Sequence, residues 1–167
     1  MGRYKIYNGP MPTTAAQLKV TTGTAIKTML QLKPFNTGKI IAWGFSFDGS
    51  AAATPGTVEL IETGTVPATA LTAHVDVDIV KTASVEDAVA SIAGLTLATN
   101  GTGYTAGAEG AITATRVFDA VLAPPTGPYV YQFPLGQEPK LIIGNHTRIR
   151  MTFGTAVNAL CWIEVEF

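Results

Sequence analysis

The chain has 167 residues and a mass of 17.5 kDa, which is enough for one hydrophobic core and too little for two ordinary domains. Only 14% of the residues are charged, and 11 basic and 12 acidic side chains leave a formal net charge of −1, so the molecule lacks the positive field that attracts nucleic acid. No apolar run is long enough to cross a bilayer and no export signal is recognisable, so we expect no membrane partner either.

Residues 1–14 are expected to form an N-terminal arm. They contain Gly9-Pro10 and Pro12 and show no sustained hydrophobic periodicity, which is typical of a segment that lies outside the core. Residues 15–167 then form a single domain. The chain is rich in Thr, Ala and Gly and poor in helix-forming residues, so this domain is predicted to be all-β.

The first half of the domain contains three clear strand patterns. Residues 26–32 alternate between apolar and largely polar positions, and Pro34 follows them. Residues 39–48 place large side chains on one face, expected to face the core, and small ones on the other, where another layer or subunit can approach closely. A wide loop over residues 48–56 leads to a strand over residues 57–63. The large set of the second strand is Ile41, Trp43, Phe45 and Phe47, and the small set is Ala42, Gly44 and Ser46.

The middle of the chain is a Thr/Ala/Gly-rich insertion over residues 68–115. Residues 74–80 alternate, which predicts a strand with Val75, Val77 and Ile79 inside. Residues 84–89 can instead begin a short helix with Ser84 as N-cap. The Gly-rich stretch over residues 99–110 is expected to be a mobile loop.

The C-terminal third continues the β pattern. Proline and glycine clusters separate further apolar runs. The whole chain therefore predicts an antiparallel β-sandwich of about eight strands. The expected strands of this third cover residues 112–122, 129–133, 140–144, 148–153 and 158–167.

Few residues offer catalytic or metal-binding chemistry. His74, Asp76 and Asp78 would share one face of a strand, where successive side chains lie about 6.6 Å apart. This spacing is too wide for all three to reach one ion, so we expect no metal there. The pattern alone does not decide whether these residues bind an ion. The only candidate bases are His74 and His146, and no nucleophile elbow or phosphate loop is present, so we expect neither catalysis nor a cofactor. The single cysteine, Cys161, lies in an apolar run and is expected to be buried.

Two stretches resemble a known family. Residues 41–49 (Ile-Ala-Trp-Gly-Phe-Ser-Phe-Asp-Gly), followed by Val58-Glu59-Leu60, resemble a strand-loop-strand motif of small virion proteins of tailed bacteriophages. Residues 131–139 (Tyr-Gln-Phe-Pro-Leu-Gly-Gln-Glu-Pro) and Arg148-Ile149-Arg150-Met151 are similar to the C-terminal half of that family. The insertion departs from the shorter family pattern.

The resemblance implies a jelly-roll-like sandwich that decorates or cements the exterior of a phage capsid after assembly in the host cytoplasm. It implies no enzymatic activity, the major capsid protein lattice as partner, and a homo-oligomer, commonly a trimer. Exposed loops and the arm are the expected contact elements. The candidate contact residues are Tyr4, Tyr7 and Met11 in the arm, Asp48 and Gly49 in the first loop, and Asn100 and Tyr104 in the second.

Two other functions fit the same pattern. β-sandwiches also serve as carbohydrate- or receptor-binding modules, and Trp43, Trp162, Tyr129 and Tyr131 offer rings on which a sugar could stack. The same aromatic residues are typical of cores and subunit contacts. A tail structural subunit shares the assembly chemistry and differs only in its place in the virion.

Overall fold

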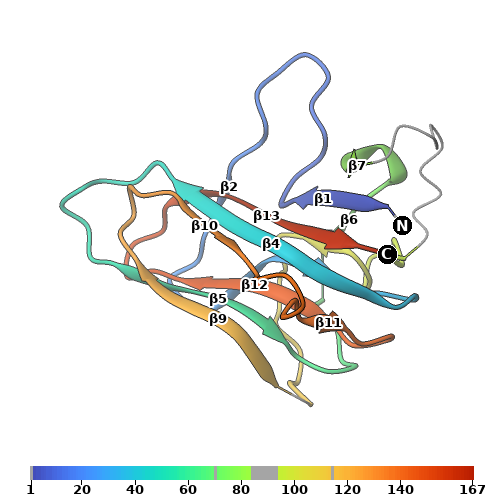
Figure 1. Cartoon of the computed structure of the whole chain (residues 1–167). Coiled ribbons are helices and arrows are strands. Elements are labelled where there is room, and N and C mark those ends of the chain that lie inside the picture. The colour runs from blue at the N-terminus through green and yellow to red at the C-terminus, as the bar shows by residue number, and fades with distance from the viewer. Residues whose placement is uncertain (1, 70, 84–93, 114) are drawn as a thin grey trace.

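Two antiparallel β-sheets pack face to face in the computed structural model, which describes residues 2–69, 71–83, 94–113 and 115–167 (Figure 1). The first sheet has the strand order β10-β4-β13-β1-β7, with β11 beside β4 and β2 beside β13. Its strands are β1 (Arg3–Tyr7), β2 (Val20–Thr21), β4 (Gly38–Phe47), β7 (Ile79–Ala83), β10 (Tyr129–Gln132), β11 (Lys140–Leu141) and β13 (Asn158–Glu166).

The second sheet has the order β6-β8-β3-β12-β5-β9. Its strands are β3 (Lys27–Leu32), β5 (Gly56–Glu62), β6 (Thr72–Ala73), β8 (Gly103–Tyr104), β9 (Arg116–Ala123) and β12 (Thr147–Thr152). The predicted all-β antiparallel sandwich is therefore confirmed.

The strand order is that of a jelly roll. Within the first sheet, β1 pairs with β13, and the run β1-β13-β4-β10 faces the run β3-β12-β5-β9 of the second sheet. The chain crosses between the sheets from β3 to β4, from β4 to β5, from β9 to β10 and from β12 to β13. Such connections build the paired Greek keys of jelly rolls. The short strands β6, β7 and β8 all lie in the insertion between β5 and β9.

The main core lies between the two sheets and includes Trp43 and Phe45 of β4, as the alternation of this strand predicts. The pairing of β4 with β13 passes from Ala42–Glu164 to Ile40–Val165, so Ile41 is an extra residue in β4. Because this bulge reverses the alternation, Ile40 takes the place in the main core that was expected for Ile41.

The insertion covers the outer face of the second sheet and explains why that face is polar yet buried. Arg148 is fully buried, and its guanidinium donates to the carbonyl oxygens of Glu109 (2.7 Å) and Val66 (2.6 Å). Gln31 donates to the Gly101 carbonyl (2.8 Å) and accepts from the Ala68 amide (2.9 Å). These polar side chains fasten the insertion to the sheet, because each buried polar group needs a partner.

The prediction that the first 14 residues lie outside the core is wrong for residues 3–7. These residues form β1, which pairs with β13 on one side and β7 on the other, and Tyr4 and Ile6 point into the core. An alternation of only five residues is too short to be recognised beside a Gly-Pro turn. The segment that leaves the sandwich begins after Asn8, whose backbone and side chain still bind β13.

The strand predicted over residues 74–80 is also wrong at its start. Asp76–Asp78 form one 3-10 turn, and Val75 and Val77 are 56% and 77% exposed, whereas His74 and Asp78 are buried. The valines were predicted to lie inside, but His74 and Asp78 are the buried residues. Both are held inside by hydrogen bonds, because the His74 ring and the Asp78 carboxylate bind backbone groups. The helix weighed for residues 84–89 lies outside the described residues.

Candidate contact surface

A loop over residues 8–19, here called the N-terminal loop, projects from the sandwich between β1 and β2 (Figure 1). Its two ends are close, since a Cβ added at Gly9 would lie 3.3 Å from the Leu18 Cβ, and the Gln17 side chain donates to the Pro10 carbonyl (3.0 Å). Residues 13–16 at its tip are exposed, and Leu18 is 49% exposed. The two ends of the loop are therefore held together, as in an omega loop.

Asn8, at the start of the N-terminal loop, is hydrogen-bonded to Ala159 and Cys161 of β13, and two further contacts fix the base of the loop. The Met11 amide donates to the Asp78 carboxylate (3.0 Å), whose other oxygen accepts from the Val75 amide (3.1 Å). On the other side, Lys19 forms an ion pair with Asp48, and this pair lowers the pKa of the Asp48 carboxyl. The insertion and the β4–β5 loop therefore both hold the N-terminal loop.

His74 joins the end of β1 to the insertion. Its Nε2 donates to the Tyr7 carbonyl (2.8 Å), since a carbonyl can only accept, and its ring packs edge-on against Tyr104 with 5.0 Å between centroids. The predicted contact residues Tyr7, Met11 and Tyr104, which are far apart in sequence, are thus brought together around His74 and Asp78.

The other predicted contact residues are not in this cluster. Tyr4 is buried and packs against Phe167, so its ring is not available to a partner. Asp48 is exposed near the base of the N-terminal loop, and the Gly49 amide donates to the Pro125 carbonyl (2.8 Å), which fastens the β4–β5 loop to the β9–β10 loop. Asn100 is exposed in a turn of the insertion.

Sequence reasoning missed Lys19 and the structural role of Asp78, whose partners Asp48 and Met11 it did select. Asp78 had been considered only as a metal ligand, and Lys19 had not been considered at all. The contact from Met11 to Asp78 spans 67 residues, and the ion pair of Lys19 and Asp48 spans 29. A local sequence pattern does not encode a contact over such a distance. The single Lys19 near a polar loop is only a weak signal of an ion pair.

The two tryptophans considered for sugar stacking lie on opposite sides of the first sheet. Trp43 is fully buried, so no sugar can stack on it. Trp162 lies on the outer face of the first sheet against Gly44, where a Cβ would come within 2.8 Å of the indole. The Lys5 ammonium lies 3.7 Å from the centroid of the Trp162 ring, so one side of this ring is already occupied by a cation.

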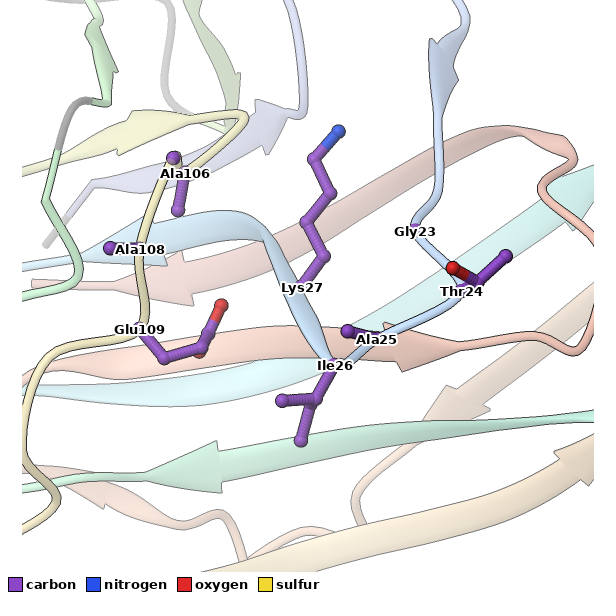
Figure 2. A pocket seen from close by; sticks show the side chains of 9 residues that line it. Gly23, Thr24, Ala25, Ile26, Lys27, Ala106, Ala108 and Glu109 are labelled. Atoms are coloured by element: carbon purple, nitrogen blue, oxygen red, sulfur yellow. The ribbon is translucent and has the colours of Figure 1, made fainter.

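The lining of a pocket beside the start of β3 includes one cation, Lys27, and one carboxylate, Glu109 (Figure 2). Lys27 points its ammonium away from Glu109 in this view and donates to the Thr21 carbonyl (2.7 Å). The Glu109 carboxylate accepts from the Thr28 hydroxyl (2.7 Å) and the Thr28 amide. Both charges are used to join segments of the chain, so the pocket has no group poised for proton transfer.

The residues weighed for metal or nucleophilic chemistry are separated or engaged. No group of three His, Cys, Asp or Glu side chains is placed to hold a metal ion in the part of the chain that the structure describes. Burial raises the pKa of the Cys161 thiol, which disfavours the reactive thiolate. His146 is buried and its Nδ1 donates to the Gly64 carbonyl (2.9 Å).

We expect acid to destabilise the folded chain through its two histidines. Burial lowers the pKa of His74, against the opposing effects of the Tyr7 carbonyl and Asp78. Burial, Arg148 and Lys33 lower the pKa of His146, against its bond to Gly64. Both folded-state pKa values lie below the unfolded value of about 6.5, so the stabilisation is complete above that pH and is lost as the pH falls.

The measurement is the thermal midpoint between pH 8 and pH 5. The matched variant is His74→Gln with His146→Asn, because glutamine can donate from the position of Nε2 and asparagine from that of Nδ1. Its midpoint should change less than that of the natural chain between about pH 6.5 and 5. Equal slopes for the two proteins would contradict the prediction.

No protein-family model, curated protein or solved structure matches this chain. In the described residues, no helix has the length and apolar character needed to span a membrane.

Proposed function

We propose that this chain is a structural subunit of a bacteriophage virion that decorates or cements the capsid exterior. The single observation that carries the proposal is the N-terminal loop, which projects from a jelly roll and is held at its base by Asp78, Asp48 and an internal hydrogen bond. A projecting loop with a fixed base loses less conformational freedom on binding than an arm with a free end, so more of its contact energy contributes to affinity.

The partner is the lattice of the major capsid protein, together with other copies of this chain. A subunit that binds the assembled lattice and not its free subunits stabilises the shell by mass action, and many modest contacts add up over the particle. The exposed tip of the loop is formed by Thr13, Thr14, Ala15 and Ala16, which carry no charge, so attachment is expected to depend weakly on salt. The trimer stays a prediction from the family resemblance.

Shortening the N-terminal loop should weaken capsid binding without unfolding the sandwich. The variant replaces residues 12–16 with two glycines, which keeps Met11, Gln17 and Lys19 at the base. Deleting residues 1–14 is unsuitable, because it would remove β1 from the middle of the first sheet. We expect roughly a tenfold or larger loss of affinity for mature capsids, since a few central contacts carry most of the binding energy of an interface.

Affinity is measured by co-sedimentation of the purified chain with undecorated capsids. The control variant is Leu135→Ser, which alters a 91% exposed residue of the β10–β11 loop outside the proposed surface. Unchanged capsid affinity in the shortened variant would remove the N-terminal loop from the proposal. Failure of the natural chain to bind any capsid, combined with saturable binding on a glycan array, would favour the carbohydrate-binding module.

A further inference from the structure

The longest of the four outer strands of the two sheets is β9. β10 has four residues between Pro128 and Pro134, β6 has two residues, and β7 carries Lys81. Short length, proline and lysine are three protections of a strand edge, and a bulge or an inward-pointing charge is another. β9 has eight residues with no proline or lysine, and among the described residues it pairs only with β5 (Figure 1).

The two charged side chains of β9 are used within the chain. Arg116 donates to both oxygens of the Glu62 carboxylate (2.9 and 2.7 Å), and the Asp119 carboxylate accepts from the Trp43 indole (3.1 Å) and the Tyr129 hydroxyl (2.7 Å). Asp119 therefore faces the sandwich. The outer side of the strand instead shows Leu122, which is 71% exposed.

The regular part of β9 is its second half. The pairing with β5 passes from Leu60–Asp119 to Ile61–Val117, so Phe118 is a bulge near the start of β9. From Asp119 to Ala123 the faces alternate: Val121 and Ala123 pack on the core, while Ala120 and Leu122 face outward. In the part of the chain that the structure describes, no strand pairs with the outer edge of this segment, so its backbone donors and acceptors can pair with another strand.

We propose that β9 pairs in antiparallel fashion with β9 of a second copy of this chain, with the two Val121 residues opposite each other. An antiparallel edge is complementary to its own copy, because a two-fold rotation brings donors against acceptors. This register keeps both core faces aligned and places Leu122 opposite Ala120 of the second copy, which covers the exposed leucine. The contact joins the second sheets of two copies into one continuous sheet and does not depend on the proposed capsid function.

Disulfide cross-linking tests the register directly. In the double variant Ala120→Cys with Leu122→Cys, the thiol at position 120 of one copy lies opposite the thiol at position 122 of the second copy. Cys161 is the only natural cysteine and is fully buried, so it does not compete. We expect mild oxidation to give a covalent dimer on a non-reducing gel. Either single variant should give much less dimer, because neither thiol then has a partner opposite it. No dimer, or equal dimer from the single variants, would overturn the proposal.

Introducing a charge on the outer face of β9 tests the pairing of two copies independently. Leu122→Lys should lower the fraction of paired chains in analytical ultracentrifugation at a concentration where the natural chain associates. Val130→Lys is the matched control, because Val130 is 65% exposed on β10, the edge of the other sheet. Circular dichroism confirms that each variant is folded. A folded Leu122→Lys variant that associates like the natural chain, or a natural chain that stays monomeric at all concentrations, would overturn the proposal.

Discussion

Replacing Arg148 with alanine should lower the free energy of unfolding by about 3–5 kcal/mol, which is the usual cost of removing one partner from a buried charged network. The guanidinium is fully buried, and burial lowers its pKa to about 10 although the Glu109 carboxylate lies 3.6 Å away. Its loss would leave the carbonyl oxygens of Val66 and Glu109 without their donor. Glu109 belongs to the insertion, and Val66 lies just before it. The insertion should therefore loosen from the second sheet before the core unfolds.

Chemical denaturation measures the free energy, and hydrogen exchange locates the loosened segment. Arg148→Lys keeps the charge but cannot reach both carbonyls with a planar fork, so it should recover only part of the loss. Arg3→Ala is the control: Arg3 pairs with Glu166 on the exposed face of the first sheet and should shift the denaturation midpoint far less. An Arg148→Ala protein with natural stability and natural exchange would show that the buried network does not fasten the insertion.

The sandwich itself could be predicted because its long strands are amphipathic with a period of two. β4 and β13 alternate large and small or apolar and polar side chains, and this pattern is local. The order of the strands is not local, because β1 pairs with β13 across almost the whole chain. The jelly-roll order was therefore available only from the family resemblance and not from the alternation.

The two buried arginines of β12 show what the alternation of a strand does not predict. In β12, Arg148 and Arg150 alternate with Ile149 and Met151, which predicts a strand with one solvent face. Both arginines are instead buried, because the insertion covers that face and Glu59 pairs with Arg150. The periodicity of a strand tells which residues share a face, but it carries no information about what lies above that face.

The positions of the candidate contact residues show the same limit. Tyr7, Met11 and Tyr104 were selected as members of flexible segments, and the structure gathers them around His74 and Asp78. Tyr4 was selected on the same ground and is buried, because the segment around it continues the first sheet. Composition identifies a segment rich in turn formers, whereas the exposure of one ring depends on pairing with distant strands.

Replacing Asp119 with alanine should lower the free energy of unfolding by about 2–4 kcal/mol, since one buried and one partly buried donor lose their shared acceptor. The Trp43 indole (3.1 Å) and the Tyr129 hydroxyl (2.7 Å) both donate to this carboxylate, which joins β4 and β10 of the first sheet to β9 of the second. Burial and Asp119 together raise the pKa of Tyr129 to about 12.

Ultraviolet titration of the tyrosines separates the role of Asp119 from a general loss of packing. In the Asp119→Ala variant the pKa of Tyr129 should fall, because both the hydrogen bond and the negative charge are removed, whereas burial alone would still hold it above its ordinary value. Asp119→Asn keeps an acceptor oxygen without the charge, so it should retain most of the stability while lowering the Tyr129 pKa. An alanine variant with unchanged stability would mean that water replaces the carboxylate, and that the two sheets are held at this edge by apolar packing alone.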